Sequence, residues 1–180
     1  MLHSTVANIR RLEIEDIGER ITRGAIAGIV AGLVFLIATM GYVTTQGKPA
    51  VAPMIDISTI FHGQDQPVPS SDNVVIGLVT HLTLSIAFGV VFGLLALLIP
   101  RRAVIVLSAG VVYGLLLYVV NFQIFGRTLF PWFTDPNGPD QGFEVLIHAV
   151  FGLVLAPFLI GRTQPAGAHV READLATTMR

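Results

Sequence analysis

Four long apolar runs alternate with shorter polar segments along the chain. They cover Gly24–Val43, Val74–Ile99, Ala103–Phe125 and Phe143–Ile160. A helix needs about 20 apolar residues, within a range of roughly 17–25, to cross the hydrocarbon of a bilayer. All four runs fall in or next to that range. The pattern therefore predicts an all-α integral membrane bundle of four transmembrane helices, connected up-down-up-down.

The polar segments divide the rest of the chain. Residues 1–23 alternate charged residues with Ile and Leu, which predicts a cytoplasmic amphipathic segment ahead of the bundle. Residues 24–161 form the four-helix transmembrane domain, with outer loops at 44–73 and 126–142. Residues 162–180 are expected to be a cytoplasmic tail.

Two of the connecting segments carry turn signals. In the first outer loop, Pro53–His62 has the pattern of a short helix, with Pro at its first position and Gly63 just past its end. The turn Pro100–Arg102 is very short. It predicts that the second and third helices form a tight antiparallel hairpin.

Composition agrees with a membrane location and excludes several kinds of chemistry. Hydrophobic residues make up 53% of the chain and charged residues only 13%, against about 25% charged residues in a typical soluble domain. The formal net charge of −1 argues against a nucleic-acid partner, which would need a basic patch. The absence of cysteine excludes disulfides, thiolate nucleophiles and cysteine metal sites.

The distribution of Lys and Arg predicts the orientation. Basic residues accumulate in the cytoplasmic segments of membrane proteins. With the N-terminus inside, the outer segments contain only Lys48 and Arg127. The cytoplasmic segments then contain nine arginines, namely Arg10, Arg11, Arg20, Arg23, Arg101, Arg102, Arg162, Arg171 and Arg180. The bias of nine to two places both termini in the cytoplasm.

Glycines spaced four apart recur on three of the apolar runs. Small residues at this spacing let helix backbones approach closely in a membrane. We expect them to pack helices within one bundle, with a dimerisation face as the alternative. The residues are Gly24, Gly28, Gly32, Gly89, Gly93, Gly110 and Gly114. In addition, His81 and His148 each precede a Phe-Gly pair, which suggests two tandem helical hairpins; low-complexity membrane sequence explains the likeness nearly as well.

Four polar residues are predicted to share one level in the outer half of the bilayer. His81 lies about 10 Å and His148 about 8 Å below the outer ends of their helices, at 1.5 Å per residue. Asn121 lies about 6 Å below the end of its helix, and Glu144 precedes His148 by one turn. Polar groups in hydrocarbon normally face the bundle interior, so we expect these four to meet there.

The polar level allows several interpretations. An interhelical hydrogen-bond network is one, because such networks are common in membrane bundles. A haem or copper ion held by His81 and His148 is another, and proton transfer through Glu144 and His148 is a third. The second outer loop contains a turn rich in Asp, Pro and Gly, without the spacing of a calcium-binding loop.

The layout resembles that of small four-helix inner-membrane proteins of bacteria that are classed as domains of unknown function. The resemblance rests on the glycine-rich Gly24–Gly32, on Leu129–Phe133 and on His148 before Phe151-Gly152. It implies a location in the bacterial plasma membrane and transfers no catalytic residue.

These observations favour a protein without catalytic activity, because no hydrolase, phosphate-loop or metalloprotease motif occurs. The leading hypothesis is a membrane subunit or accessory protein that contacts the lipid bilayer and packs in a larger membrane complex or a homo-oligomer. The alternative is a haem-, metal- or proton-handling protein that uses the polar level. A small transporter is a weaker alternative, because four helices leave little room for alternating access.

Overall fold

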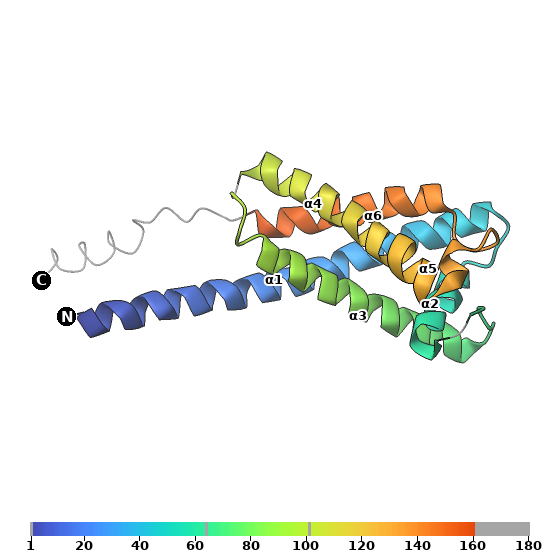
Figure 1. The fold of residues 1–180 in the computed structure, drawn as a ribbon, viewed down its shortest axis with the longest axis horizontal. Coiled ribbons are helices and arrows are strands. Elements are labelled where there is room, and N and C mark those ends of the chain that lie inside the picture. Colours follow the sequence, from blue (N-terminus) through green and yellow to red (C-terminus); the bar gives the residue numbers. More distant parts are fainter. Residues whose placement is uncertain (1, 64, 101, 161–180) are drawn as a thin grey trace, which may run out of the picture.

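A computed structural model describes residues 2–63, 65–100 and 102–160, with the side chains of residues 2–16 excepted. The predicted tail 162–180 lies outside the described residues. Within them the regular elements are helical throughout (Figure 1). They are the α-helices α1 (Leu2–Thr45), α2 (Ala52–His62), α3 (Ser71–Leu95), α4 (Ala103–Tyr118), α5 (Gly126–Thr128) and α6 (Gln141–Leu155), the π-helix η1 (Val119–Phe125), and the 3₁₀ turns η2 (Pro131–Thr134) and η3 (Ala156–Leu159).

Four helical stretches in the described part of the chain are long and apolar enough to cross a membrane. They are Ile17–Thr45, Ser71–Leu95, Ala103–Thr128 and Gln141–Leu159. Their outward faces expose large apolar side chains, among them Ile37, Val75, Val104 and Leu146. Such a surface is stable against lipid and costly against water. The chain is therefore an all-helical protein of the kind that crosses a membrane several times.

Polar caps move the helix boundaries away from the ends of the apolar runs. The Ser70 side chain accepts a hydrogen bond from the backbone N–H of Asn73, so α3 begins before the predicted Val74. The Asp140 carboxylate caps α6 in the same way through the N–H of Phe143. At the other end of α3 the regular helix stops at Leu95, ahead of Pro100, whose preceding residue disfavours helical geometry.

The N-terminal segment is not separated from the first span. Helix α1 runs unbroken from Leu2 to Thr45 (Figure 1), through the predicted boundary at Gly24. No proline interrupts this stretch, so the backbone hydrogen bonds continue from the span into the segment before it. The prediction that 1–23 is amphipathic concerns side chains that lie largely outside the described residues.

The short helix predicted in the first outer loop is confirmed. Helix α2 covers Ala52–His62, with Pro53 in its first turn, and Gly63 ends it with a φ of 61°. A residue with a side chain rarely adopts this left-handed conformation, so glycine suits the position. Helix α2 packs against α3 so closely that a Cβ at Gly77 would collide with the backbone carbonyl of Met54.

The bundle is made of two helix pairs. Helices α3 and α4, although consecutive in the chain, belong to different pairs. Helix α3 packs along α1, α4 packs along α6, and α1 and α6 join the pairs. Over their described lengths α3 and α4 meet chiefly through Tyr113, whose hydroxyl donates a hydrogen bond to the Phe88 carbonyl at 2.9 Å and whose ring stacks on Phe92. The prediction of a tight hairpin across the Pro100 turn is wrong, because the glycine-lined contacts lie elsewhere.

Glycines form the crossing point in each pair. A Cβ at Gly28 of α1 would collide with the Ser85 carbonyl of α3, and one at Gly114 of α4 would collide with the His148 carbonyl of α6. The backbones themselves are therefore in contact. Backbone atoms or short side chains of the facing helix also lie within Cβ reach of the other glycines of the stripes, Gly24, Gly32, Gly89, Gly93 and Gly110, and of Gly152 on α6. The two pairs share this arrangement, and a sequence repeat remains a prediction.

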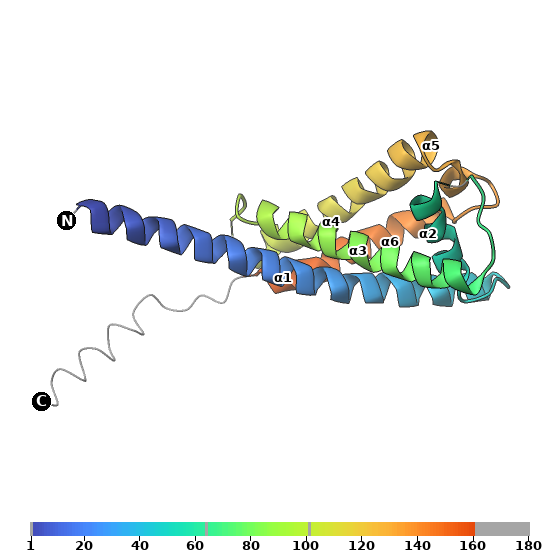
Figure 2. The same ribbon diagram turned by 90° about the horizontal axis from the view of Figure 1, so that it is seen from below.

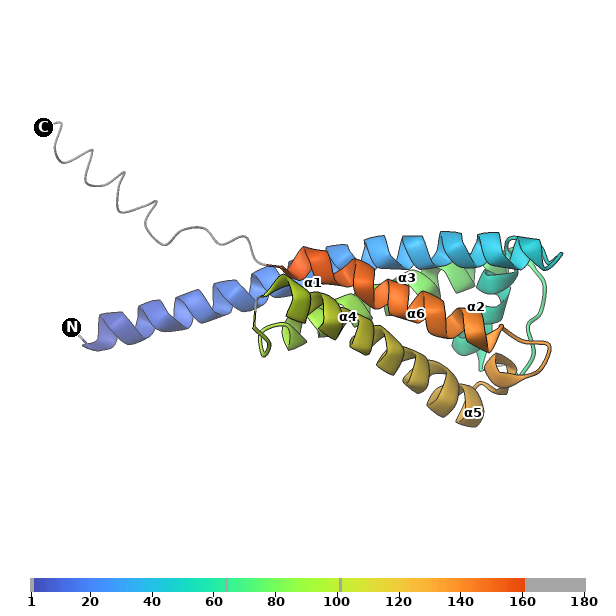
Figure 3. The ribbon, with the colours of Figure 1, turned by 90° about the horizontal axis from the view of Figure 1, so that it is seen from above.

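The two halves of the bundle differ in packing. The main apolar core, which includes Ala27, Phe92, Val106 and Leu155, lies toward the end where α3 leads into α4. Toward the other end, which holds α2 and η2, the continuation of α4 through η1 to α5 diverges from α3 and α6 (Figures 2 and 3). We call this the α2 end. The divergence opens the interior there.

Candidate functional site

A cavity of about 800 Å³ occupies the bundle interior toward the α2 end. Helices α1, α2, α3 and α6, together with η1 and the loop around η2, all contribute to its wall. Bundle interiors of this kind are common places for small-molecule sites. The divergence of α4 and η1 from α3 leaves the space that the cavity fills (Figure 2).

All four residues of the predicted polar level line this cavity, namely His81, Asn121, Glu144 and His148. The side chains of His81, Glu144 and His148 are buried, and Asn121 is half-buried. Phe35 of α1 connects the two histidines: its ring centroid lies 5.4 Å from that of His81 and 5.1 Å from that of His148. The two imidazoles thus share a neighbour, and no direct ring contact joins them within the described structure.

Both imidazoles donate hydrogen bonds to backbone carbonyl oxygens. His81 Nε2 lies 2.9 Å from the carbonyl oxygen of Gly32, and His148 Nδ1 lies 2.8 Å from that of Glu144. A carbonyl oxygen can only accept, so these nitrogens carry the protons. In the neutral rings His81 Nδ1 and His148 Nε2 are therefore the atoms left with lone pairs.

The Glu144 carboxyl is buried without a close donor. Its side chain is 7% exposed, and its Oε2 lies 3.6 Å from His148 Nδ1, which is longer than a hydrogen bond. That nitrogen already donates to the Glu144 backbone carbonyl. Within the described structure the carboxyl accepts no hydrogen bond, which is costly for a buried polar group.

Asn121 lies in the π-helix η1, where the helix turns are wider than in α4 before it. Insertions of π geometry are rare and frequent at functional sites. The Asn121 side-chain amide faces the cavity and has no hydrogen-bond partner among the described residues. Its donor and acceptor are free for a ligand or for water.

Helix α2 contributes an acid that the sequence pattern did not single out. Asp56 lines the cavity, and burial raises the pKa of its carboxyl to about 6, against the opposing effects of the Trp132 indole and the Lys48 ammonium. The available signal was a lone acid among the apolar residues of α2. The Trp132 indole near it belongs to η2, so the two residues meet only when the loop that holds α2 and the loop after η1 come together.

The loops at the α2 end contribute residues to the wall of the cavity, among them Lys48, Asp135 and Asp140. Tyr42 of α1 stacks on Phe143 of α6, with ring centroids 3.9 Å apart and planes 4° from parallel. The backbone N–H of Phe143 and the Tyr42 hydroxyl lower the pKa of the adjacent Asp140 carboxyl. The Asp-Pro-Asn turn after η2 is confirmed, because the Asp135 carboxylate accepts from the backbone N–H of Asn137 at 2.8 Å.

His62 at the end of α2 is exposed and has a partner within the protein. Its Nε2 lies 3.0 Å from Oδ1 of Asn73, so it ties the end of α2 to the start of α3. This contact lies outside the cavity. It holds the helix that carries Asp56 against the bundle.

A haem or metal ion held by the two imidazoles stays a prediction. Among the described residues no group of three His, Cys, Asp or Glu side chains is placed to hold a metal ion. The Phe35 ring lies against both imidazoles. The cavity presents hydrogen-bond acceptors, such as the Glu144 carboxyl, together with the free amide of Asn121, among aromatic rings.

Comparison with known proteins adds no assignment. No family model, curated protein or solved structure matches the chain.

Proposed function

We propose that this protein binds a small amphipathic molecule within a membrane, in the cavity of its four-helix bundle, without transforming it. The observation that carries the proposal is the cavity itself. It has a volume of about 800 Å³, within the range of roughly 300–1,000 Å³ typical of ligand pockets. Its polar groups lie among apolar walls, which is the arrangement that orients a ligand with one polar part.

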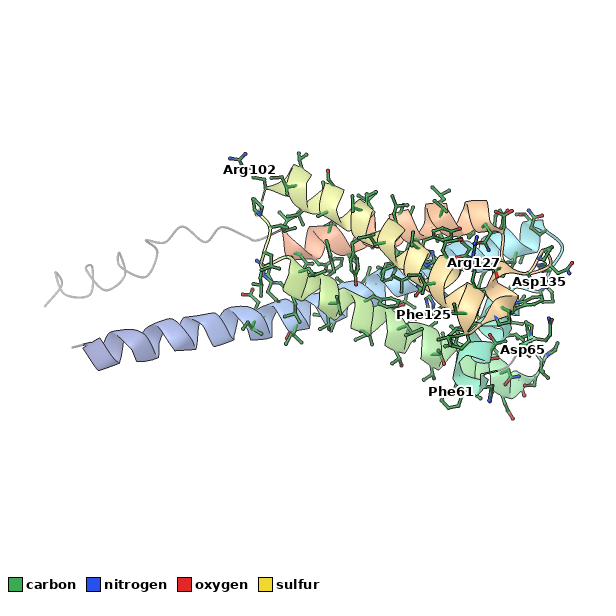
Figure 4. The ribbon with its side chains drawn as sticks, viewed as in Figure 1. Phe61, Asp65, Arg102, Phe125, Arg127 and Asp135 are labelled. Atoms are coloured by element: carbon green, nitrogen blue, oxygen red, sulfur yellow. The ribbon has the colours of Figure 1, made fainter. Side chains whose placement is uncertain are left out.

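The proposed setting is the bacterial plasma membrane, with four crossings and both termini in the cytoplasm. The nine-to-two distribution of basic residues supports the orientation. Arg102 lies at one end of the bundle and Arg127 near the α2 end (Figure 4), so the α2 end and the mouth of the cavity would face outward. The loops at that end also contain Trp132 and Phe130, and aromatic residues favour the headgroup level.

A role as a subunit or accessory protein is a second proposal, favoured by the length of α1. A helix of 44 residues is about 66 Å long at 1.5 Å per residue, roughly twice the 30 Å of a hydrocarbon core. The first part of α1 accordingly projects beyond the other helices (Figures 1 and 2). Such an extension offers a surface for a membrane-protein partner or a second copy of the chain.

Occupancy of the cavity can be tested without knowing the ligand. The protein is purified from its membrane, and small molecules retained by it are measured by native mass spectrometry. Leu84→Trp places a large ring on a residue that lines the cavity. Val79→Trp is the matched control, because Val79 lies on the same helix and is 58% exposed on its outer face.

We expect the wild type and Val79→Trp to retain the same adduct and Leu84→Trp to lose it, while all three unfold at similar temperatures. Equal retention by all three proteins would contradict the binding proposal. A Leu84→Trp variant that does not fold would be replaced by Ile57→Trp, which narrows the same cavity from α2.

A further inference from the structure

We infer that the cavity selects organic cations with an apolar, ring-containing body. The inference deepens the proposed binding function and rests on it. Its basis is the excess of acidic over basic residues in the wall, one buried acid and the aromatic side chains that line the same cavity.

Acidic residues outnumber basic ones in the wall of the cavity. Asp56, Asp135, Asp140 and Glu144 line the cavity, whereas Lys48 is the one Lys or Arg among its lining residues. The Lys48 ammonium lies at the exposed mouth, 3.3 Å from the Asn137 carbonyl, to which it donates. A surface with this imbalance attracts cations and repels anions.

Glu144 is the acid best placed to hold a bound cation. Its side chain is more than nine-tenths buried, lines the cavity, and has no hydrogen-bond donor within the described structure. Neutral His148 cannot compensate it, because its Nδ1 proton is directed to the Glu144 backbone carbonyl. A cation in the cavity would give the ionised carboxylate the partner that the protein does not supply.

Aromatic rings from three elements line the same cavity. Phe35 and Tyr42 come from α1, Phe122 from η1, and Phe143 from α6, and all four line the cavity. The face of an aromatic ring attracts a cation through its quadrupole, most strongly where water is excluded. The same rings can also pack against the apolar, ring-containing part of the ligand.

The free nitrogens of the two imidazoles also favour a positively charged donor over an acceptor. His81 Nδ1 and His148 Nε2 hold lone pairs, since the other nitrogen of each ring donates to a carbonyl. An ammonium or onium group satisfies acids and lone pairs together. An anion would meet both with repulsion, so charge is the property that the site distinguishes.

Two probe ions of nearly equal shape and opposite charge test the inference. Equilibrium dialysis of the full-length protein in detergent, corrected with protein-free micelles, measures binding of tetraphenylphosphonium and tetraphenylborate. We expect saturable binding of the phosphonium, at least about tenfold tighter than that of the borate, which corresponds to about 1.4 kcal/mol.

Two variants locate the effect. Glu144→Gln should weaken phosphonium binding at least about tenfold, because it removes the charge and keeps the shape. Asp65→Asn should leave it unchanged: Asp65 is exposed at the same end of the molecule (Figure 4) and lies outside the cavity wall. If Glu144→Gln fails to fold, Asp56→Asn at pH 7.5 takes its place and should also weaken binding.

Equal binding of the two ions, or unchanged phosphonium binding after removal of the acids, would overturn the inference. Failure of the proposed binding function would give a different result. In that case native mass spectrometry would find no adduct that is present in the wild type and lost in Leu84→Trp. A protein that retains a neutral adduct and rejects the phosphonium would retain its binding function and lose the cation specificity inferred here.

Discussion

The Nδ1 atom of His148 lies 2.8 Å from the backbone carbonyl oxygen of Glu144, one helical turn earlier in α6. The contact fixes the tautomer of the imidazole, because only a protonated nitrogen can donate to that oxygen. It also leaves the Glu144 carboxyl without the proton donor nearest to it. One local hydrogen bond thereby determines both which nitrogen of His148 has a lone pair and that the Glu144 carboxyl lacks a donor.

The two buried histidines should be opposite tautomers. We predict Nδ1–H for His148 and Nε2–H for His81, whose Nε2 donates to the Gly32 carbonyl at 2.9 Å. Nitrogen-15 NMR of histidine-labelled protein at alkaline pH distinguishes the two forms, and His81→Gln and His148→Gln assign the signals. The same tautomer at both sites would contradict the hydrogen-bond pattern.

Loss of the hydrogen bond from His81 to the Gly32 carbonyl should weaken the packing of α1 against α3. We expect His81→Phe to lower the free energy of unfolding by about 1 kcal/mol, the usual net contribution of one hydrogen bond. His81→Gln should lose less, because its amide can still donate toward the Gly32 carbonyl. Thermal unfolding in detergent measures both, and equal stability of His81→Phe and wild type would show that the bond contributes nothing.

A methyl group at a helix crossing should be enough to disturb the bundle. Gly28→Ala and Gly114→Ala place a Cβ against backbone carbonyls of the facing helix, so we expect each to destabilise the protein by about 1–3 kcal/mol. The measurement is the unfolding temperature in detergent.

The matched control is Gly41→Ala. Gly41 lies in α1 with nothing within 4 Å of its Cβ position, so alanine should be neutral or stabilise by up to about 1 kcal/mol. Gly47 is unsuitable as a control, because its φ of 75° would strain any side chain. Similar losses at Gly28 and Gly41 would refute the close approach of the backbones.

Asp56 should make stability depend on pH. Burial raises its pKa from 3.8 to about 6 in the folded protein, so folding favours the protonated carboxyl. Its contribution is fully present below about pH 4 and is lost as pH rises through about 6, with a total on the order of 2 kcal/mol. Asp56→Asn lacks this loss, so it should gain in unfolding temperature relative to wild type between pH 4 and 7.

The same titration should govern binding of a cation. The titratable groups that interact with Asp56 include Lys48 and Glu144, and the Trp132 indole is its polar neighbour. Ionisation of Asp56 adds a negative charge to the wall, so phosphonium affinity should rise as pH increases through about 6. In Asp56→Asn this step should be absent, and a wild-type affinity that falls over that range would contradict the assignment.

The membrane orientation can be examined with reporter fusions. A reporter joined after Arg180 should be active only if it is one that works in the cytoplasm, and one inserted in the loop 135–138 should be active only if it works outside. The reason is the accumulation of arginine at the termini and the Pro100 turn. Periplasmic activity of the Arg180 fusion would reverse the proposed orientation.

Periodicity along the chain was enough to identify the helices and the polar residues among them. A membrane span is a local property, set by about 20 consecutive apolar residues. The level of His81, Asn121 and His148 also follows from local geometry, because each residue adds 1.5 Å along its own helix. The Pro53–Gly63 helix was equally readable, from one residue that starts helices and one that ends them.

Which helices pair, and what lies between them, depended on contacts between residues far apart in sequence. Glycines allow helices to approach closely but do not determine which helices pair. The prediction therefore relied on the short Pro100 turn, which wrongly suggested that α3 packs on α4. The actual partners are decided by the fit of Gly28 against Ser85 and of Gly114 against His148. The cavity and the position of Asp56 in its wall follow from that pairing, since the space left open between diverging helices is a property of the whole bundle and of no single segment.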